Sequence, residues 1–144
     1  MKSRRKIQHP TKLSEEMQSL FDVINNESDL ACVLIGASYL DQALAALLTQ
    51  YFIESGSVSM LLDPPKGALS TYASRYTLAY CLGLIPKQIF QNLEVIGSIR
   101  NIFAHSHLHV KFTNPEVVEL VDQLKYPTID EYVIIGEIGS VPPV

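Results

Sequence analysis

The chain has 144 residues, which is the size of one domain around a single hydrophobic core. Hydrophobic residues make up 47% of it and charged residues 18%, a composition that excludes a disordered chain. The formal net charge of −4 argues against binding of nucleic acid by broad electrostatic attraction alone. We therefore expect one folded domain over residues 1–144.

The N-terminus carries the only basic run, "KSRRK", and we expect residues 1–10 to be a solvated tail. No apolar stretch of the signal-peptide kind follows these basic residues, so the cytoplasm is the expected location. Cys32 and Cys81 lie far apart among apolar residues, where a free cysteine behaves as a small hydrophobic side chain. The pattern indicates neither a redox motif nor a cofactor.

Two helices are predicted in the first third of the chain. Apolar side chains recur every three or four residues over 13–26, which is typical of an amphipathic helix. Ser28 is a good N-cap for a second helix, which we expect to run to about Ser55 and to end with Gly56 as its C′ glycine. Because this second helix is apolar nearly all round, it should form the buried centre of the fold.

The segment "LACVLIGASYLDQALAALL", Leu30 to Leu48, is also long enough to span a bilayer. Asp41 and Gln42 lie at its middle, and a central aspartate costs about 2.5–3.5 kcal/mol on membrane-insertion scales. The segment has no aromatic belt, and its Ala and Leu residues recur at helical spacing. We therefore interpret it as the central helix of a bundle, with no membrane contact.

Prolines and glycines divide the next part of the chain. Residues 63–70, "DPPKGALS", form a turn in which Gly67 is suited to a positive φ. A third helix is predicted over residues 69–82, closed by Gly83. A fourth begins with Pro86 in its first turn and continues through Phe103.

Asn114 followed by Pro115 predicts the start of a fifth helix, which ends near Lys125. Residues 126–144 form an apolar C-terminal tail, and the β-branched stretch 132–138 within it suits a short strand. The predicted fold is an all-α bundle of about five helices with an irregular or short-strand tail.

The stretch "GSIRNIFAHSH" at the end of the fourth helix has an unusual polar side. On a helical wheel its aliphatic residues form one face, and the opposite sector holds Gly97 and Ala104 at its centre. Glycine inside a helix costs about 1 kcal/mol relative to alanine, so Gly97 indicates the close approach of another helix. That helix belongs either to the same chain or to a second subunit of a homodimer. Around the two small residues lie Glu94, Arg100, Asn101 and His105.

A purely structural role explains these polar residues as well. A histidine near a helix C-terminus interacts favourably with the helix dipole. Arg100 and Asn101 would then cap carbonyl groups or pair with a buried acid. Asp41, inside the apolar second helix, is the first candidate for that acid, and Glu94 is the second.

The histidines of "HSHLH", His105, His107 and His109, also raise the question of a metal site. Alternate spacing aligns side chains only on an extended strand, and no carboxylate lies nearby in sequence. We interpret the segment as a loop with incidental histidines, so no metal ligand is assigned.

The run from Gly67 to Ser106 resembles the mannitol operon repressor (MtlR-type) family. The resemblance implies an all-helical regulator that represses a sugar-utilisation operon and has no recognisable DNA-reading motif. Repression would then act through a protein partner, with the chain as a homodimer packed around the fourth helix. The residues that carry the resemblance are Gly67, Leu69, Arg75, Tyr80, Leu82, Gly83, Ile85, Arg100 and His105.

The spacing of Arg100 and His105 is also similar to the Arg–x4–His motif of the HEPN superfamily, whose members include many ribonucleases. This resemblance implies a cleft between two subunits and RNA as the partner. Neutral His105 would accept the ribose 2′-OH proton, Arg100 would stabilise charge on the phosphate, and Asn101 would orient it. The products would carry 2′,3′-cyclic phosphate ends, without a metal. The non-catalytic regulator is the main hypothesis and this ribonuclease is the alternative.

Overall fold

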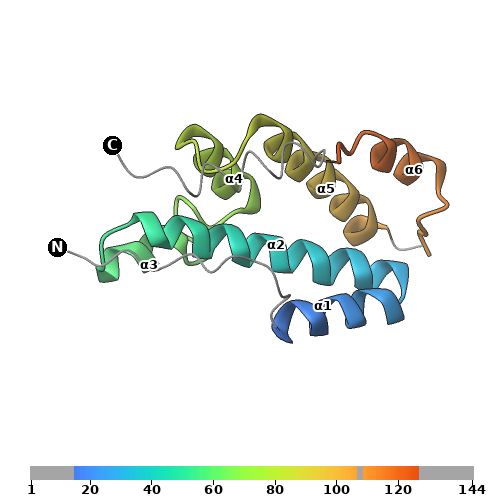
Figure 1. Cartoon of the computed structure of the whole chain (residues 1–144), viewed down its shortest axis with the longest axis horizontal. Coiled ribbons are helices and arrows are strands. Elements are labelled where there is room, and N and C mark those ends of the chain that lie inside the picture. The colour runs from blue at the N-terminus through green and yellow to red at the C-terminus, as the bar shows by residue number, and fades with distance from the viewer. Residues whose placement is uncertain (1–14, 107–108, 127–144) are drawn as a thin grey trace.

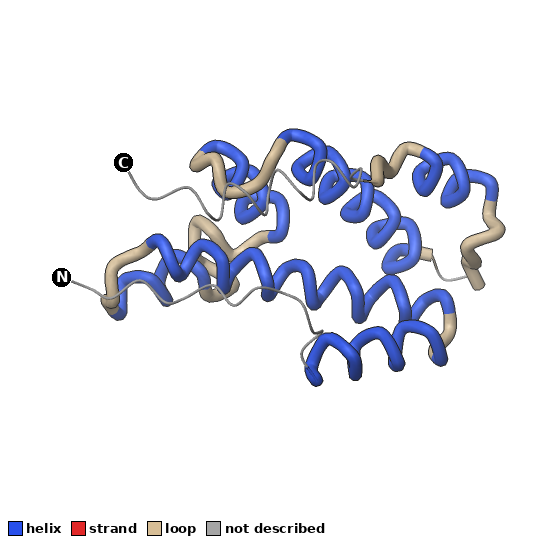
Figure 2. The backbone as a smooth tube through the Cα atoms, viewed as in Figure 1, coloured by secondary structure: helices blue, strands red, loops and turns tan. Residues whose placement is uncertain are grey.

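The computed structural model describes residues 15–106 and 109–126, and these residues form helices joined by loops (Figures 1 and 2). The all-α fold class is therefore confirmed. The segments 1–14 and 127–144, with the predicted basic tail and strand, lie outside the described residues. The helices are α1 (Glu15–Asn26), α2 (Asp29–Tyr51), α3 (Gly56–Leu62), α4 (Tyr72–Cys81), α5 (Lys87–His105) and α6 (Pro115–Asp122).

The first two helices form an antiparallel hairpin, and the N-cap predicted at Ser28 is confirmed. The Ala31 backbone N–H donates to the Ser28 hydroxyl oxygen at 3.2 Å. The predicted end of the second helix is wrong, because α2 ends at Tyr51 and Gly56 begins the additional helix α3. Ser55 explains the difference, since its hydroxyl accepts from the Ser57 N–H at 3.2 Å and so caps a new helix.

The remaining helix ends follow the predicted turn chemistry closely. Gly83 has φ of +72° after α4, and the Leu84 N–H donates back to the Ala79 carbonyl at 2.9 Å. Asn114 caps α6 by accepting from the Glu116 N–H at 3.1 Å. The third predicted helix begins later than expected, at Tyr72, because the preceding residues are part of the turn.

Figure 1 shows α2 lying between α1 on one side and the α4–α5 pair on the other. One buried cluster joins α2, α4 and α5, and a second joins α5 and α6 around Phe103. The prediction that α2 is buried all round is only partly right. It buries Ala37, Leu44 and Leu48, whereas Leu34 and Ile35 on another side remain exposed. By length and composition alone, α2 would be able to cross a membrane.

A ladder of aromatic rings holds α4 against α5. Tyr72, Tyr76 and Tyr80 are spaced four residues apart on one face of α4. Tyr76 meets Tyr72 edge-on at 5.1 Å between ring centroids and Phe90 of α5 at 5.4 Å. Tyr80 stacks on the same Phe90 ring at 4.6 Å. Such pairs add about 0.5–1.5 kcal/mol each beyond the area that they bury.

The turn before α4 depends on Gly67 for steric reasons. The Leu69 N–H donates to the Leu61 carbonyl at 2.8 Å, which brings the two sides of the loop together. A Cβ on Gly67 would overlap the Leu61 carbonyl and lie 2.8 Å from the Asp63 carbonyl oxygen. The expected positive φ at Gly67 is wrong, since among described glycines only Gly83 has one. The constraint is the close approach of backbone to backbone.

We predict that Gly67→Ala lowers the free energy of unfolding by about 2–3 kcal/mol, because the backbone atoms around the new methyl group cannot yield easily. The matched control is Gly36→Ala in α2, where an added Cβ meets nothing within 4 Å. That control is expected to be neutral or to stabilise by up to about 1 kcal/mol through helix propensity. Urea unfolding of both variants measures the difference, and equal effects would contradict the steric argument.

Candidate functional site

The close approach predicted at Gly97 comes from within the same chain. A Cβ on Gly97 would lie 3.1 Å from Cε1 of Tyr72, a buried side chain of α4. The glycine therefore makes room for an aromatic ring. Ala104 lies two helical turns after Gly97 on the same face of α5, and it is exposed. The dimer contact expected there stays a prediction.

Tyr72 is held on three sides by α5. Its hydroxyl donates to the Leu93 carbonyl at 2.8 Å, and the ring edge lies against Gly97. The guanidinium carbon of Arg100 lies 5.8 Å from the ring centroid, within cation–π range. Burial raises the pKa of the Tyr72 hydroxyl well above its usual range, so the hydroxyl remains a neutral donor.

The expected pairing of Arg100 with Asp41 is wrong. Asp41 instead pairs with Arg75 of α4, with 3.0 Å between Oδ1 and Nη1. Arg75 is buried, and a buried cation without a partner is strongly unfavourable. The ion pair with Asp41 supplies that partner. Arg100 donates from Nη2 to the Asn101 side-chain oxygen at 3.3 Å and stacks on Tyr72.

Arg75 joins α2, the end of α3 and the loop before α4. Its Nε donates to the Leu69 carbonyl and its Nη2 to the Leu62 carbonyl, both at 2.8 Å. Together with the Asp41 pair, these bonds fix the loop between α3 and α4 against α2. We call Arg75, Asp41 and the carbonyls of Leu62 and Leu69 the Arg75 cluster. Three of the motif residues, Gly67, Leu69 and Arg75, thus belong to one structural unit.

The remaining polar residues of α5 do not form a cleft within one chain. Glu94, Asn101 and His105 are exposed, and Arg100 is half-buried. Arg100 and His105 line neither the groove between α1 and α2 nor the groove between α5 and the residues that follow α6. The ribonuclease alternative therefore needs a second subunit to enclose these groups, and it stays a prediction.

The histidine-rich segment adds no metal centre in the residues that can be described. His105 and His109 are exposed, and His107 lies outside the described residues. Within 15–106 and 109–126, no three His, Cys, Asp or Glu side chains are grouped so as to hold a metal ion.

Asn92 is a structural residue that the sequence analysis did not single out. Its side-chain nitrogen donates to the Lys125 carbonyl at 2.6 Å, and the Lys125 N–H donates to its oxygen at 2.9 Å. This paired contact ties the chain after α6 to α5. The resulting groove of about 550 Å³ has Glu94 in its wall. The signal in the sequence was weak, since an asparagine beside a glutamine on an amphipathic helix has many explanations.

We predict that Arg75→Ala lowers the free energy of unfolding by about 3 kcal/mol, because it leaves the Asp41 carboxylate and two loop carbonyls without a partner. Asp41→Asn should cost less, since the Asp41 side chain is 31% exposed and makes one of the four Arg75 contacts. Lys87→Ala on the α5 surface is the control and should change stability by less than about 0.5 kcal/mol. Urea unfolding distinguishes the three, and an Arg75 effect as small as that of Lys87 would contradict the role of the cluster.

Tyr72 is expected to make stability fall at alkaline pH. The pKa of Tyr72 is higher in the folded state than in the unfolded state. Its contribution to the free energy of unfolding is therefore complete below the unfolded-state pKa near 10, and it is lost as the pH rises towards the folded-state pKa. At pH 8, Tyr72→Phe should cost about 1 kcal/mol through the missing bond to Leu93. Between pH 9.5 and 11, the stability of Tyr72→Phe should decline less steeply than that of wild type. Denaturant unfolding across this range is the measurement, and parallel pH profiles would contradict the assignment.

Comparison with known proteins agrees with this architecture. The chain matches the solved structure titled "X-ray structure of the MtlR-HPr complex from Escherichia coli" with a TM-score of 0.66 and 21% sequence identity. The match covers 87% of this chain and 85% of that one, so it shows a shared fold. No match is found among curated proteins. The sequence profile of the mannitol repressor family, MtlR, matches residues 16–134, and the chain therefore belongs to the mannitol repressor family.

Proposed function

We propose that this chain is a transcription regulator of the mannitol repressor type that acts through a protein partner, and that the partner is HPr. The observation that carries the proposal is the fold shared, over most of both chains, with a family member whose solved structure is a complex with HPr. The partner-dependent mechanism predicted from the sequence is consistent with that complex.

The charge distribution of the described surface supports a protein partner over direct reading of DNA. No lysine or arginine occurs between Leu13 and Pro65, although acidic residues are frequent there. Helix α5 carries Lys87 and Arg100 as its basic residues, and Arg100 lies over the Tyr72 ring. A helix that reads the major groove needs several free polar and basic side chains on one face, and α5 instead packs its apolar face into the core.

A cytoplasmic homodimer remains part of the proposal. Asn101, Ala104 and His105 form an exposed strip at the end of α5, and this strip offers a place for a second subunit. On the other side of the same helix end, the buried Phe103 packs with Ile99 and Val117, which would support such an interface.

We predict that purified HPr from the host of this chain binds the wild-type protein with a dissociation constant on the order of micromolar, as is typical of a regulatory contact. Isothermal titration calorimetry at two salt concentrations is the measurement. A basic protein of similar size, such as cytochrome c, serves as the control for unspecific attraction to the acidic surface. Equal binding of HPr and cytochrome c, or no binding of HPr, would contradict the proposal.

His105→Ala separates the regulator from the ribonuclease alternative. The variant should bind HPr within about twofold of wild type, because the regulator does not use His105 as a base. Neither protein should release 2′,3′-cyclic phosphate ends when it is incubated with total RNA. Cleavage by wild type that disappears in His105→Ala would instead support the ribonuclease.

A further inference from the structure

The outer face of α4 carries no charged side chain. Its exposed residues are Ala73, Thr77, Tyr80 and Cys81. Leu82, which follows them, is 49% exposed, and Arg75, the charged residue of α4, is buried in the Arg75 cluster. A helix at the surface of a globular protein normally turns a charged or strongly polar face to water. The uncharged face of α4 therefore indicates that another segment covers it.

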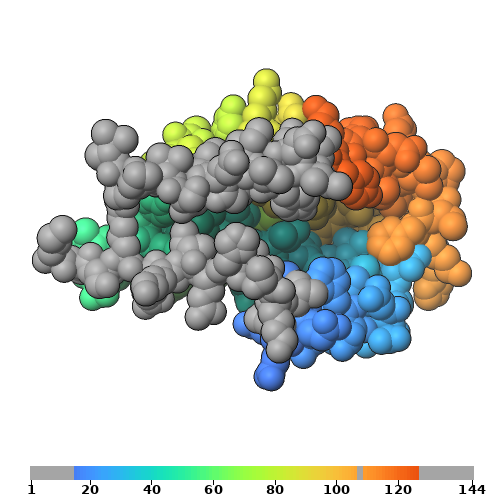
Figure 3. All heavy atoms as spheres, in the orientation of Figure 1, coloured from blue at the N-terminus to red at the C-terminus, as the bar shows by residue number. Residues whose placement is uncertain are grey.

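The chain approaches this face after α6, which runs antiparallel to α5. Val117 of α6 packs with Ile99 and Phe103 near the end of α5. Further along the chain, Lys125 lies beside Asn92, and two hydrogen bonds of 2.6 and 2.9 Å hold its backbone there. Figure 3 shows α4 and α6 along the same edge of the molecule, opposite α1. The chain beyond Lys125 therefore starts on the edge that holds α4, and it is directed towards the start of α5.

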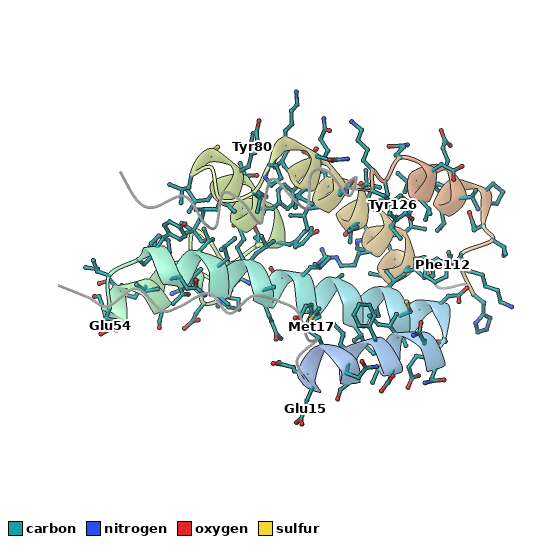
Figure 4. The ribbon with its side chains drawn as sticks, in the orientation of Figure 1. Glu15, Met17, Glu54, Tyr80, Phe112 and Tyr126 are labelled. Atoms are coloured by element: carbon teal, nitrogen blue, oxygen red, sulfur yellow. The ribbon has the colours of Figure 1, made fainter. Side chains whose placement is uncertain are left out.

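The distance that remains to α4 is short. Helix α5 begins at Lys87, so about 8 Å of helix separate that residue from Asn92. Residues 127–131 span about 16 Å when they are extended, which is more than this distance. The axes of packed helices such as α4 and α5 lie about 8–10 Å apart, so residues 132–138 can reach the outer face of α4. In Figure 4, Tyr80 lies at this outer edge of the molecule.

The segment that follows Lys125 has the composition that such a face requires. Its apolar residues are Ile129, Tyr132, Val133, Ile134, Ile135 and Ile138. Asp130 and Glu131 come at the point where the chain passes Lys87, and this pairing favours the same course although an exposed ion pair adds little energy. The segment is also tethered at Lys125, which gives it an effective concentration on the order of millimolar beside α4. A separate protein or a second copy has no such advantage.

We infer that residues 129–138 lie across the outer face of α4 and cover Thr77, Tyr80 and Leu82. Asn92 positions this segment, because its two bonds to Lys125 fix the point from which the chain leaves α6. The inference goes beyond the proposed function and does not depend on HPr. It withdraws the outer face of α4 from contact with other proteins.

A spin label on Cys81 tests this contact in the full-length chain, because Cys81 is exposed at the end of α4. With Cys32→Ala as background, the label should broaden the amide resonances of residues 129–138. Thr77→Asp places a carboxylate in the middle of the face, and a carboxylate under apolar side chains is unfavourable. We expect the paramagnetic relaxation rates of residues 129–138 to fall at least about fivefold in this variant.

Thr49→Asp is the matched control, since Thr49 is an exposed threonine on α2. It should leave the relaxation rates of residues 129–138 within about 1.5-fold of the background. The double change Ile134→Asp and Ile135→Asp approaches the contact from the other side and should act like Thr77→Asp. Relaxation rates that neither Thr77→Asp nor the double change lowers would overturn the inference.

The positioning role of Asn92 has its own measurement. Asn92→Ala removes both bonds to Lys125 and should lower the relaxation rates of residues 129–138 at least about threefold. Gln88→Ala, one turn away on α5, is its control and should leave them unchanged. Equal rates in the two variants would show that Asn92 does not position the segment.

A mixed sample distinguishes the chain's own segment from that of a second copy. Spin-labelled protein without nitrogen-15 is mixed with unlabelled protein that carries nitrogen-15. The resonances of residues 129–138 should stay sharp in this mixture, because the contact is within one chain. Broadening between copies would show that the segment crosses to another subunit, and it would overturn the inference.

Discussion

The Arg75 guanidinium is the contact on which the arrangement of this protein depends. It is buried, and each of its donor nitrogens meets an oxygen from another part of the chain. A cation is stable in a buried position only when its N–H donors have acceptors, so Asp41 and the two loop carbonyls must lie within hydrogen-bond distance of it. Without the bonds of this cluster, the loop after α3 would lose its connection to α2 through Arg75. The Gly67 turn is the backbone counterpart of the same constraint, because it lets the loop fold tightly enough for its carbonyls to reach Arg75.

Most residues that resemble the mannitol repressor pattern serve the fold. Gly67, Leu69 and Arg75 form the loop contact, Gly83 ends α4, and Tyr80 stacks on Phe90. Arg100 follows the same principle, since it lies over the Tyr72 ring beside Gly97. A motif of this kind identifies the architecture of a family.

The molecule thus has two regions of different character. In the α4–α5 region, aromatic rings of the two helices pack together, and the buried Tyr72 of α4 bonds to α5. The α1–α2 hairpin is joined to that region through α2 and keeps an open groove lined by Leu20, Leu34 and Ile35 among others.

The sequence by itself determined the features that depend on near neighbours in the chain. The all-α class, the caps at Ser28 and Asn114 and the end of α4 at Gly83 follow from helical periodicity and local hydrogen bonds, and the structure has all of them. The tertiary structure alone decided which groups meet across the fold. Asp41 pairs with Arg75, 34 positions away, and Gly97 accommodates Tyr72. Helix α3 also escaped prediction, because Ser55 and Gly56 allow either the end of one helix or the start of the next. Local hydrogen bonds and periodicity determine where a helix begins and ends. The partner of a buried charge depends instead on which helices pack together, and the order of residues along the chain does not determine this locally.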